Sequence, residues 1–251
     1  NAKRYQKLDA KSAASCGGEI LRGCEKEMHP NLQGIWEHMR ELGLMALAHA
    51  NFHAVCCSFE NHMWSEFSVL QAAHAAELLL KARIAQEHPL LIFQELPRST
   101  KVSGTFIELE DLFIEGKTIQ WSDLPERLWA TTGILLPNKS KFFEFGKLRN
   151  GIQHFAPPQS NSDIGGSTLS FVFDVIDPFI NDCWGLYAID YNEDSEPYAY
   201  FANALASREI LFLVSKEAAE DSNNWDIDWA KVTKGYKDEM IKRIEMAPDV
   251  K

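Results

Sequence analysis

The chain has 251 residues, of which 45% are hydrophobic and 24% are charged, a composition typical of a globular protein that buries a core. Its formal net charge is −11 and its pI is about 5.2, which argues against a protein that coats duplex nucleic acid along a whole face. Any contact with RNA or DNA would therefore have to be made through a local cationic pocket.

Five cysteines, an odd number, lack the paired spacing of a zinc site, so we expect free thiols in a reducing cytoplasm. No run approaches the roughly 18 apolar residues that span a bilayer. The stretch from Asn1 to Lys11 is polar and no apolar segment follows it, which predicts neither a signal peptide nor a membrane segment. Phosphate-binding and dinucleotide-binding glycine motifs are also missing from the sequence, and we expect no cofactor and no metal.

Two long helices are predicted in the first third of the chain. Residues 1–30 alternate small, polar and charged side chains and are expected to form an N-terminal arm. Apolar residues recur every three or four positions over 32–59 and again over 62–87, which is the period of an amphipathic helix. The second helix should end at His88, because the residue before a proline disfavours helical geometry.

The middle of the chain is less regular. Residues 89–96 predict a short apolar segment over the two helices. Residues 106–114 could form a short helix or an edge strand, because their pattern fits neither template cleanly. A further helix is expected over 123–133, with Leu128 and Trp129 directed inward.

A helix over 141–156 follows, with Ser140 as its expected N-cap and a stop at Pro157–Pro158. Gly146 and Gly151 lie inside it, so the helix is expected either to bend or to begin only near Lys147.

The last third of the chain predicts more helix. Residues 157–167 read as a surface loop in which Gly165–Gly166 form a turn. Apolar periodicity then predicts helices over 168–184, with a kink at Pro178, over 198–219 and over about 229–246.

These elements predict an all-α fold built on an up-and-down helical bundle. The helices at 32–59, 62–87, 123–133 and 141–156 should form its core. Residues 31–185 are expected to form this bundle, and residues 186–251 a C-terminal helical extension packed on it.

Candidate catalytic residues gather near the end of the helix at 141–156. Arg149, Asn150 and His154 lie within six residues in the sequence FFEFGKLRNGIQHFAPP. Cleavage of RNA through its 2′-hydroxyl needs a base, an acid and positive charge beside the phosphorus. Histidine titrates near neutrality and serves either proton role. Arginine binds two phosphate oxygens in a fork, and an asparagine amide can orient the phosphate or the imidazole.

The spacing sets a geometric constraint on these three residues. Residues five apart on a helix are separated by about 140°, so Arg149 and His154 do not share a face. Asn150 and His154 are four apart and do share one. Arg149 must therefore reach around the helix or meet the histidine of a second subunit. Since each motif has one histidine for two proton transfers, we expect a homodimer with a composite active site.

The sequence Arg149-Asn150-Gly151-Ile152-Gln153-His154 resembles the R-x(4–6)-H motif of the HEPN superfamily, with the polar residue that often follows the arginine present as Asn150. The run HAAELLLKARIAQEHPLLIF also looks like the second helix of bacterial HEPN proteins. The resemblance covers roughly 31–185.

This resemblance implies a metal-independent endoribonuclease that dimerises so that two motifs face one cleft. Many HEPN proteins act as toxins or as antiviral defence effectors, which adds an antitoxin or regulatory protein to the expected partners. Some HEPN toxins are silenced by modification of a tyrosine two residues after the histidine. Here that residue is Ala156, which argues against this route of silencing.

Two other interpretations of the motif stay open. Part of the superfamily is not catalytic, so the chain could instead be a silent module that binds a nucleotide or a protein partner. In a purely structural interpretation, Arg149 forms a surface salt bridge, with Glu144 five residues earlier in the sequence, and His154 packs on Phe155.

Two further groups of polar residues have the spacing of a helical face. Glu77 and Lys81 are four residues apart, which predicts a local ion pair, and as an alternative Glu77 would support Arg149 across the bundle. His49 and His53 have the spacing of a helical zinc pair, but Ala50 stands where the glutamate of H-E-x-x-H would be. The helix is core-like, so we interpret these two histidines as buried, hydrogen-bonded side chains.

Overall fold

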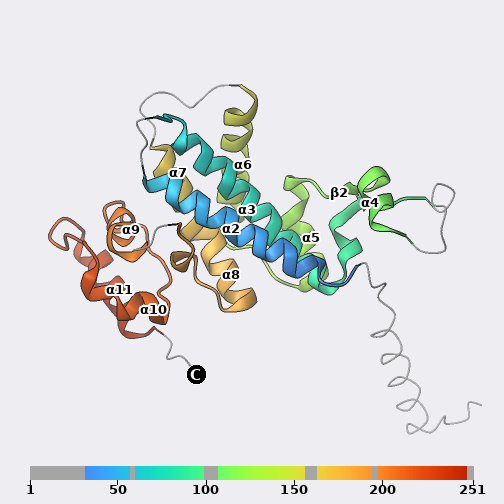
Figure 1. Ribbon diagram of the computed structural model, residues 1–251. Helices are drawn as coiled ribbons and strands as arrows, with labels where there is room; N and C mark the ends of the chain where they lie inside the picture. The colour runs from blue at the N-terminus through green and yellow to red at the C-terminus, as the bar shows by residue number, and fades with distance from the viewer. Residues whose placement is uncertain (1–31, 57–59, 99–106, 156–162, 194–196, 248–251) are drawn as a thin grey trace, which may run out of the picture. The chain divides into compact units, whose positions relative to one another are not determined.

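The structure is a computed structural model of the 251-residue chain, and it describes residues 32–56, 60–98, 107–155, 163–193 and 197–247. The predicted all-α class is confirmed, since helices make up most of the described chain (Figure 1). The expected arm at residues 1–30 and the expected stop at Pro157–Pro158 lie outside the described residues. None of the described helices is long and apolar enough to cross a membrane.

The chain divides into two compact units, one of residues 1–34 and 95–117 and one of residues 35–94 and 118–251. The first unit contains α4 (Leu109–Glu115), so the ambiguous segment at 106–114 is helical from Leu109 onward. A capping box explains this outcome, because the side chains of Glu108 and Asp111 each accept from the other's backbone N–H.

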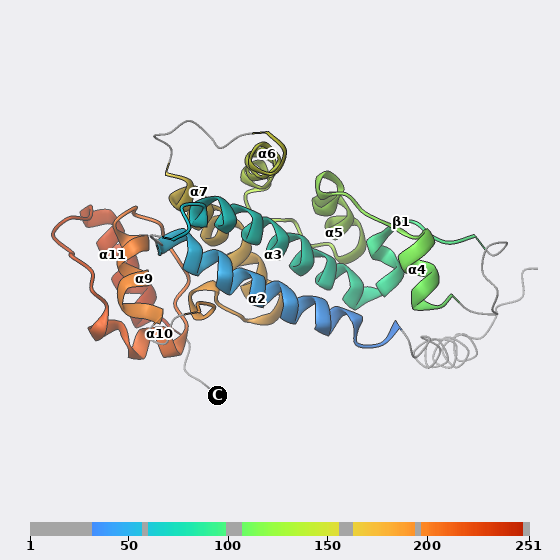
Figure 2. The same ribbon diagram turned by 45° about the horizontal axis from the view of Figure 1, so that its top comes forward.

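The second unit is organised around a helical hairpin of α2 (Ile35–Val55) and α3 (Trp64–Glu87), which run side by side in both Figure 1 and Figure 2. Both predicted helices are confirmed, each starting a few residues later than expected. Buried alanines and Gly43 let the two backbones approach closely, and a Cβ on Gly43 would be 2.9 Å from Leu79 Cγ. As predicted, α3 ends before Pro89, with His88 as its C-cap.

A short segment after α3 carries little regular structure. A 3₁₀ turn, η2 (Pro89–Ile92), leads into β1 (Phe93–Glu95), which pairs with β2 (Lys117–Thr118) in a two-stranded sheet. The 3₁₀ turn η3 (Trp121–Asp123) then leads into α5.

The helices α5 (Leu124–Thr132) and α6 (Lys139–His154) both pack on α3. Leu128 is buried as predicted, but the prediction for Trp129 is wrong, because its side chain is 53% exposed. Adjacent residues point about 100° apart on a helix, so both cannot face the same core. The N-cap of α6 is Asn138, in the left-handed region at φ 44°, and Ser140 lies inside the helix.

An almost continuous helical stretch follows, made of α7 (Ile164–Phe171), the π-helical η4 (Val172–Ile176) and α8 (Asp177–Trp184). The helix predicted over 168–184 is confirmed. The wider π turn ends at Ile176, and Pro178 lies in the first turn of α8. The carbonyl of Asp174, four residues before this proline, accepts from Asn138 Nδ2 at 2.8 Å.

The predicted loop at 157–167 is wrong for its last four residues, because Gly165 and Gly166 belong to the first turn of α7. The Asp163 side chain caps this turn by accepting from the N–H of Gly166 at 2.8 Å. This cap explains how two glycines come to start a helix.

The helix predicted over 198–219 is also wrong. It is divided into α9 (Pro197–Ala206) and α10 (Lys216–Glu220), with an extended segment between them. Glu209 adopts a positive φ of 52°, and the apolar run Ile210–Val214 that follows has side chains that favour extended backbone. The backbone groups of this run bond to side chains elsewhere in the unit. The N–H of Leu213 donates to Asp177, and the carbonyls of Ile210 and Phe212 accept from Tyr236 and Arg243.

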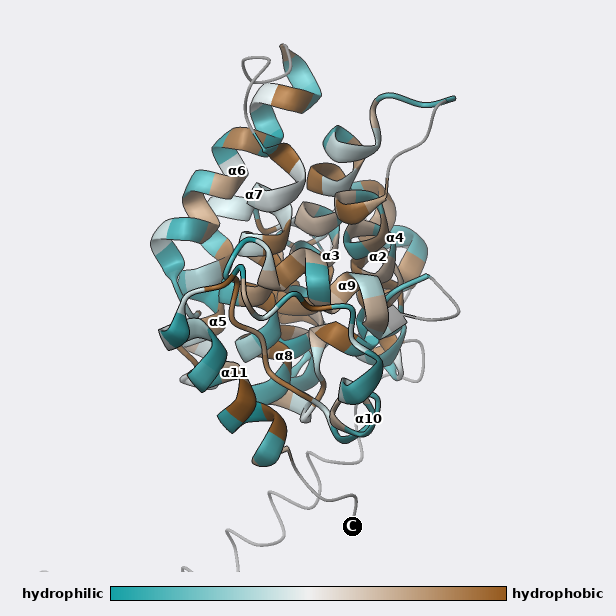
Figure 3. Cartoon of the chain, turned by 90° about the vertical axis from the view of Figure 1, so that its left-hand side faces the viewer, coloured by the Kyte–Doolittle hydropathy of each residue, from teal (hydrophilic) through white to brown (hydrophobic). Residues whose placement is uncertain are grey.

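The last helix is α11 (Lys234–Glu245), which begins later than the predicted residue 229 because Thr233 is its N-cap and accepts from Tyr236 N. The short turns η5 (Ala188–Asp190) and η6 (Ser222–Asn224) complete this part of the chain. Figures 1 and 2 show α9, α10 and α11 gathered together. Apolar and polar residues alternate along α6 and α11, as the brown and teal bands of Figure 3 show.

Close packing at Gly165 gives a testable prediction. A methyl group at this position would overlap the backbone carbonyl oxygen of Ala54 at the end of α2, and backbone cannot swing aside as a side-chain tip can. We expect Gly165→Ala to lower the free energy of unfolding by about 1–3 kcal/mol, the usual range for overpacking. Gly235→Ala in α11 is the matched control, because a Cβ there meets nothing within 4 Å. Equal urea midpoints for both variants would contradict this packing.

Candidate active site

The candidate site lies on the last two turns of α6. Phe142 and Phe145 are buried in the core and hold one side of this helix against the bundle. The helix is continuous from Lys139 to His154, through Gly146 and Gly151 alike, so it does not begin near Lys147. The five-residue spacing of Arg149 and His154 therefore separates them by about 140° around the helix.

Trp121 in η3 packs closely against α6. Its ring stacks on the ring of Phe142 with centroids 4.0 Å apart and planes 3° apart. A methyl group on Gly146 would overlap the indole Nε1 atom of Trp121, so only glycine at this position admits the ring. The indole Nε1 is buried and has no hydrogen-bond partner.

Arg149 is half-buried and lies over this tryptophan. Its guanidinium carbon is 5.3 Å from the centroid of the Trp121 ring, within the range of a cation–π contact. One terminal nitrogen, Nη1, donates to Gln153 Oε1 at 3.3 Å, and the buried Nε has no acceptor. In the part of the chain that the structure describes, Arg149 makes no ion pair, so the alternative salt bridge to Glu144 is not formed. The positive charge of Arg149 is therefore not neutralised by a neighbouring carboxylate.

Asn150 and His154 are both exposed, and their four-residue spacing puts them on one face of α6. The imidazole of His154 is 6.4 Å from the ring of Phe155 in an edge-on arrangement. Phe155 is itself 89% exposed, so this contact does not bury the histidine. The amide of Asn150 and the imidazole of His154 are thus exposed to solvent at the end of α6. The guanidinium of Arg149 lies on a different face of the same helix.

Glu77 and Lys81 form the local ion pair that their spacing predicts. Lys81 Nζ is 2.6 Å from Glu77 Oε1 and donates to Thr118 Oγ1 at 3.2 Å, and Lys81 is only 7% exposed. Among the described residues Glu77 has no contact with Arg149. The structure therefore brings Glu77 and Lys81 together with each other and not with the motif.

The rings of His49 and His53 have centroids 6.0 Å apart. The prediction that both are buried is wrong, because the His49 side chain is 48% exposed and His53 is only partly buried. His49 Nδ1 is 2.9 Å from Glu193 Oε2. Burial, and then the neighbouring His49, lower the pKa of His53. Within residues 32–56, 60–98, 107–155, 163–193 and 197–247, no three or more His, Cys, Asp or Glu side chains form a group that could hold a metal ion.

A cleft of about 540 Å³ opens along a neighbouring face of α6, between this helix, α7 and the segment after α9. Phe145 and Phe171, stacked with centroids 3.8 Å apart, form part of its apolar wall. None of Arg149, Asn150 and His154 lines it. This cleft and the sequence motif are therefore separate features of α6.

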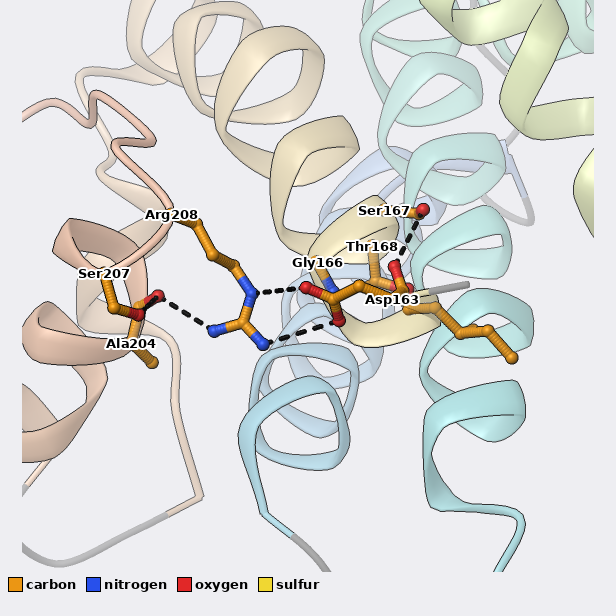
Figure 4. A network of polar contacts seen from close by, with 8 residues as sticks. Asp163, Gly166, Ser167, Thr168, Ala204, Ser207 and Arg208 are labelled. Carbon is orange, nitrogen blue, oxygen red and sulfur yellow. Dashed lines mark hydrogen bonds and ion pairs between the residues drawn. The ribbon is translucent and has the colours of Figure 1, made fainter. Parts of the chain in front are cut away.

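The cations of this cleft are already paired. Arg208 Nε donates to Asp163 Oδ2 at 2.8 Å, a contact that Figure 4 shows between α7 and the segment after α9. This hydrogen bond is the main reason why the pKa of Asp163 lies below its usual value. Lys141 donates to Ser170 Oγ at 2.8 Å and pairs with Asp174. Since both charges are neutralised, the cleft is a poor candidate for a phosphate site.

Sequence reasoning did not identify Trp121, Gly146 and Gln153 as part of the site. Gln153 is four residues after Arg149, and this spacing was a usable signal. Nothing in the sequence connects Trp121 to Arg149, because their contact depends on how η3 packs on α6.

Comparisons with protein-family models, with curated proteins and with solved structures find no match for this chain.

Proposed function

We propose that this protein is a metal-independent endoribonuclease that cleaves RNA by attack of the 2′-hydroxyl on the neighbouring phosphorus. The observation that carries the proposal is the state of Arg149, a guanidinium held over Trp121 that no carboxylate of the described residues neutralises. Asn150 and His154 are exposed at the same end of α6. The resemblance of this motif to that of the HEPN superfamily supports the same chemistry.

In this proposal each residue has a separate role. The Nη atoms of Arg149 bind the scissile phosphate and stabilise the charge that develops in the transition state. The imidazole of His154 transfers a proton, either from the 2′-hydroxyl or to the departing 5′-oxygen. The amide of Asn150, on the same face as His154, orients the phosphate or the imidazole.

The proposed mechanism requires the 2′-hydroxyl, which gives a direct test. An oligoribonucleotide with a single 2′-deoxy residue at the mapped cleavage position should resist cleavage there. The all-ribose substrate should yield a 2′,3′-cyclic phosphate and a free 5′-hydroxyl, identified by mass spectrometry. Equal cleavage of the deoxy-substituted substrate would overturn the 2′-hydroxyl mechanism.

We further propose that the active form is a homodimer whose two motifs form one composite site. Support comes from the continuous α6, which keeps Arg149 and His154 of one chain about 140° apart. Co-refolding an Arg149→Ala chain with a His154→Ala chain should give mixed dimers that regain some activity, because the shared cleft of a mixed dimer still contains one intact arginine and one intact histidine. If the mixture is no more active than either variant alone, the site is not shared.

As a biological role we propose a cytoplasmic toxin or antiviral defence effector, held in check by an antitoxin or regulatory protein. Growth arrest on expression, relieved by His154→Ala, supports this role, and arrest that persists in the variant counts against catalysis as its cause.

A second candidate is a catalytically silent module that binds a nucleotide or a protein partner. It is favoured by the net charge of −11, which opposes binding of a polyanion away from the motif. This module would bind its partner equally well with and without the His154 imidazole.

A further inference from the structure

We propose that Trp121 is a positioning residue for Arg149, fixing the guanidinium so that its terminal nitrogens face the scissile phosphate. This inference rests on the proposed ribonuclease function and extends it to a residue outside the motif. Trp121 would not touch the RNA, and it would act only through the arginine.

The contacts of Arg149 show why a second residue is needed to hold it. A guanidinium has five N–H donors in a rigid fork. The buried Nε of Arg149 has no acceptor, and Nη1 makes one hydrogen bond of 3.3 Å to the neutral Gln153. Some arginines of the described chain are held by carboxylates, such as Arg83 by Glu87 at 2.8 Å and Arg243 by Glu239 at 3.0 Å. Arg40 instead lies over the ring of Trp36 at 5.1 Å, as Arg149 lies over Trp121. At Arg149 the ring of Trp121 takes the place of such a carboxylate, and it does so without neutralising the charge.

The tryptophan itself is firmly placed. It stacks on Phe142, which is fully buried, and its ring centroid is 6.4 Å from that of Phe171. The absence of a side chain at Gly146 creates the space for its indole edge. A ring held in this way sets the position of the guanidinium above it, since Arg149 and Gly146 lie on the same helix.

This arrangement also explains which donors remain for a ligand. The Nε–H is directed into the protein, and one Nη1 donor is shared with Gln153. The remaining Nη donors are those that can form a two-point contact with phosphate oxygens. Loss of the ring would free the long side chain to rotate, and the fork would no longer be preorganised.

A double-mutant cycle tests the inference by measuring RNA cleavage. Trp121→Leu should lower kcat about 3- to 30-fold, the range that corresponds to cation–π contacts. In an Arg149→Ala background the same substitution should change kcat less than about twofold, because there is no guanidinium left to position. An equal loss in both backgrounds would show that Trp121 acts on stability or on another group. Trp129→Leu on α5, where the ring is 53% exposed, is the matched control and should leave kcat unchanged.

A second variant and an NMR measurement distinguish a positioning role of Trp121 from a folding defect. Trp121→Phe preserves an aromatic stack on Phe142 and should give a smaller loss than Trp121→Leu, so a folding defect in the leucine variant does not obscure the result. The Nε–H signal of Arg149 in a ¹⁵N NMR spectrum, assigned by its absence from Arg149→Ala, should shift in both Trp121 variants and stay in place in Trp129→Leu.

The two readouts separate failure of the inference from failure of the proposed function. An Nε–H signal that does not move in the Trp121 variants overturns the positioning role whatever the activity. A wild-type protein that does not cleave RNA overturns the function and with it the catalytic role of Trp121, even if the NMR signal shifts as expected.

Discussion

We expect Asp177→Ala to lower the free energy of unfolding by about 2–6 kcal/mol, because it leaves two buried backbone N–H groups without an acceptor at about 1–3 kcal/mol each. Asp177 is fully buried in the first turn of α8. Its Oδ1 accepts from the N–H of Ala188 at 2.8 Å, and its Oδ2 accepts from the N–H of Leu213 at 2.9 Å. One carboxyl therefore joins α8 to η5 and to the extended segment between α9 and α10.

Urea unfolding followed by circular dichroism would measure this loss. A decrease of this size is a large part of the 5–15 kcal/mol that stabilises a typical domain. Asp182→Ala is the matched control, since Asp182 is an exposed aspartate on the same helix. Similar midpoints for the wild type and Asp177→Ala would mean that the Ala188 and Leu213 N–H groups find other acceptors.

The pH dependence of the unfolding free energy gives a second test of Asp177. Burial raises the pKa of Asp177 to about 7, although the N–H groups of Ala188 and Leu213 and the charge of Arg243 act in the opposite direction. An unfolded aspartate has a pKa of about 3.9, so between these two values the folded protein binds a proton that the unfolded chain does not. The stabilisation that comes from this bound proton is therefore complete below about pH 4, and it is lost as the pH rises to about 7.

Asp177→Asn removes this titration while keeping the shape of the side chain. The difference in unfolding free energy between the wild type and this variant should therefore grow as the pH falls from about 7 toward 4. Subtracting the two curves cancels the effect of other titrating groups. A difference that stays constant over the same interval would show that the two N–H groups outweigh burial and that Asp177 is ionised throughout it.

The second large effect is expected in catalysis. His154→Ala should reduce the rate of RNA cleavage by about 10²- to 10⁴-fold, the usual contribution of general acid–base catalysis. Arg149→Ala should reduce it by about 10²- to 10³-fold, as when a single donor to a developing negative charge is removed. Arg149→Lys should retain part of the rate, because an ammonium keeps the charge and loses the two-point contact.

Matched variants make this result specific. His74→Ala removes another exposed histidine, on α3, and should leave the rate unchanged. Added imidazole should partly restore cleavage by His154→Ala and should have no such effect on Arg149→Ala. If His74→Ala is as inactive as His154→Ala, the loss does not come from the motif.

Sequence patterns were sufficient to predict the helices that nearby residues determine. The hairpin of α2 and α3 followed from apolar periodicity, and its end at His88 followed from the proline after it. The helix predicted over 198–219 failed because contacts with residues distant in the sequence add to the local preference of residues 210–214 for extended backbone. The backbone around Leu213 is held by Asp177 on a distant helix, and Arg243 of α11 donates to the carbonyl of Phe212 at 2.9 Å.

Some features of the candidate site could be predicted from sequence spacing, and others depend on tertiary packing. The position of Arg149, Asn150 and His154 on one helix, and the separation of the arginine from the histidine, could be predicted from spacing alone. The contact between Trp121 and Arg149 could not, because it depends on tertiary packing that the space above Gly146 permits. Sequence spacing gave the ion pair of Glu77 and Lys81, and a supporting role for Glu77 at Arg149 finds no contact in the described residues.

Cleavage of total RNA by the purified wild-type protein in EDTA, beside Arg149→Ala and His154→Ala, tests the proposed function most directly. The account predicts cleavage by the wild type alone, at a rate that EDTA does not change. Cleavage that EDTA abolishes, or that both variants retain, would contradict a metal-independent site at the end of α6.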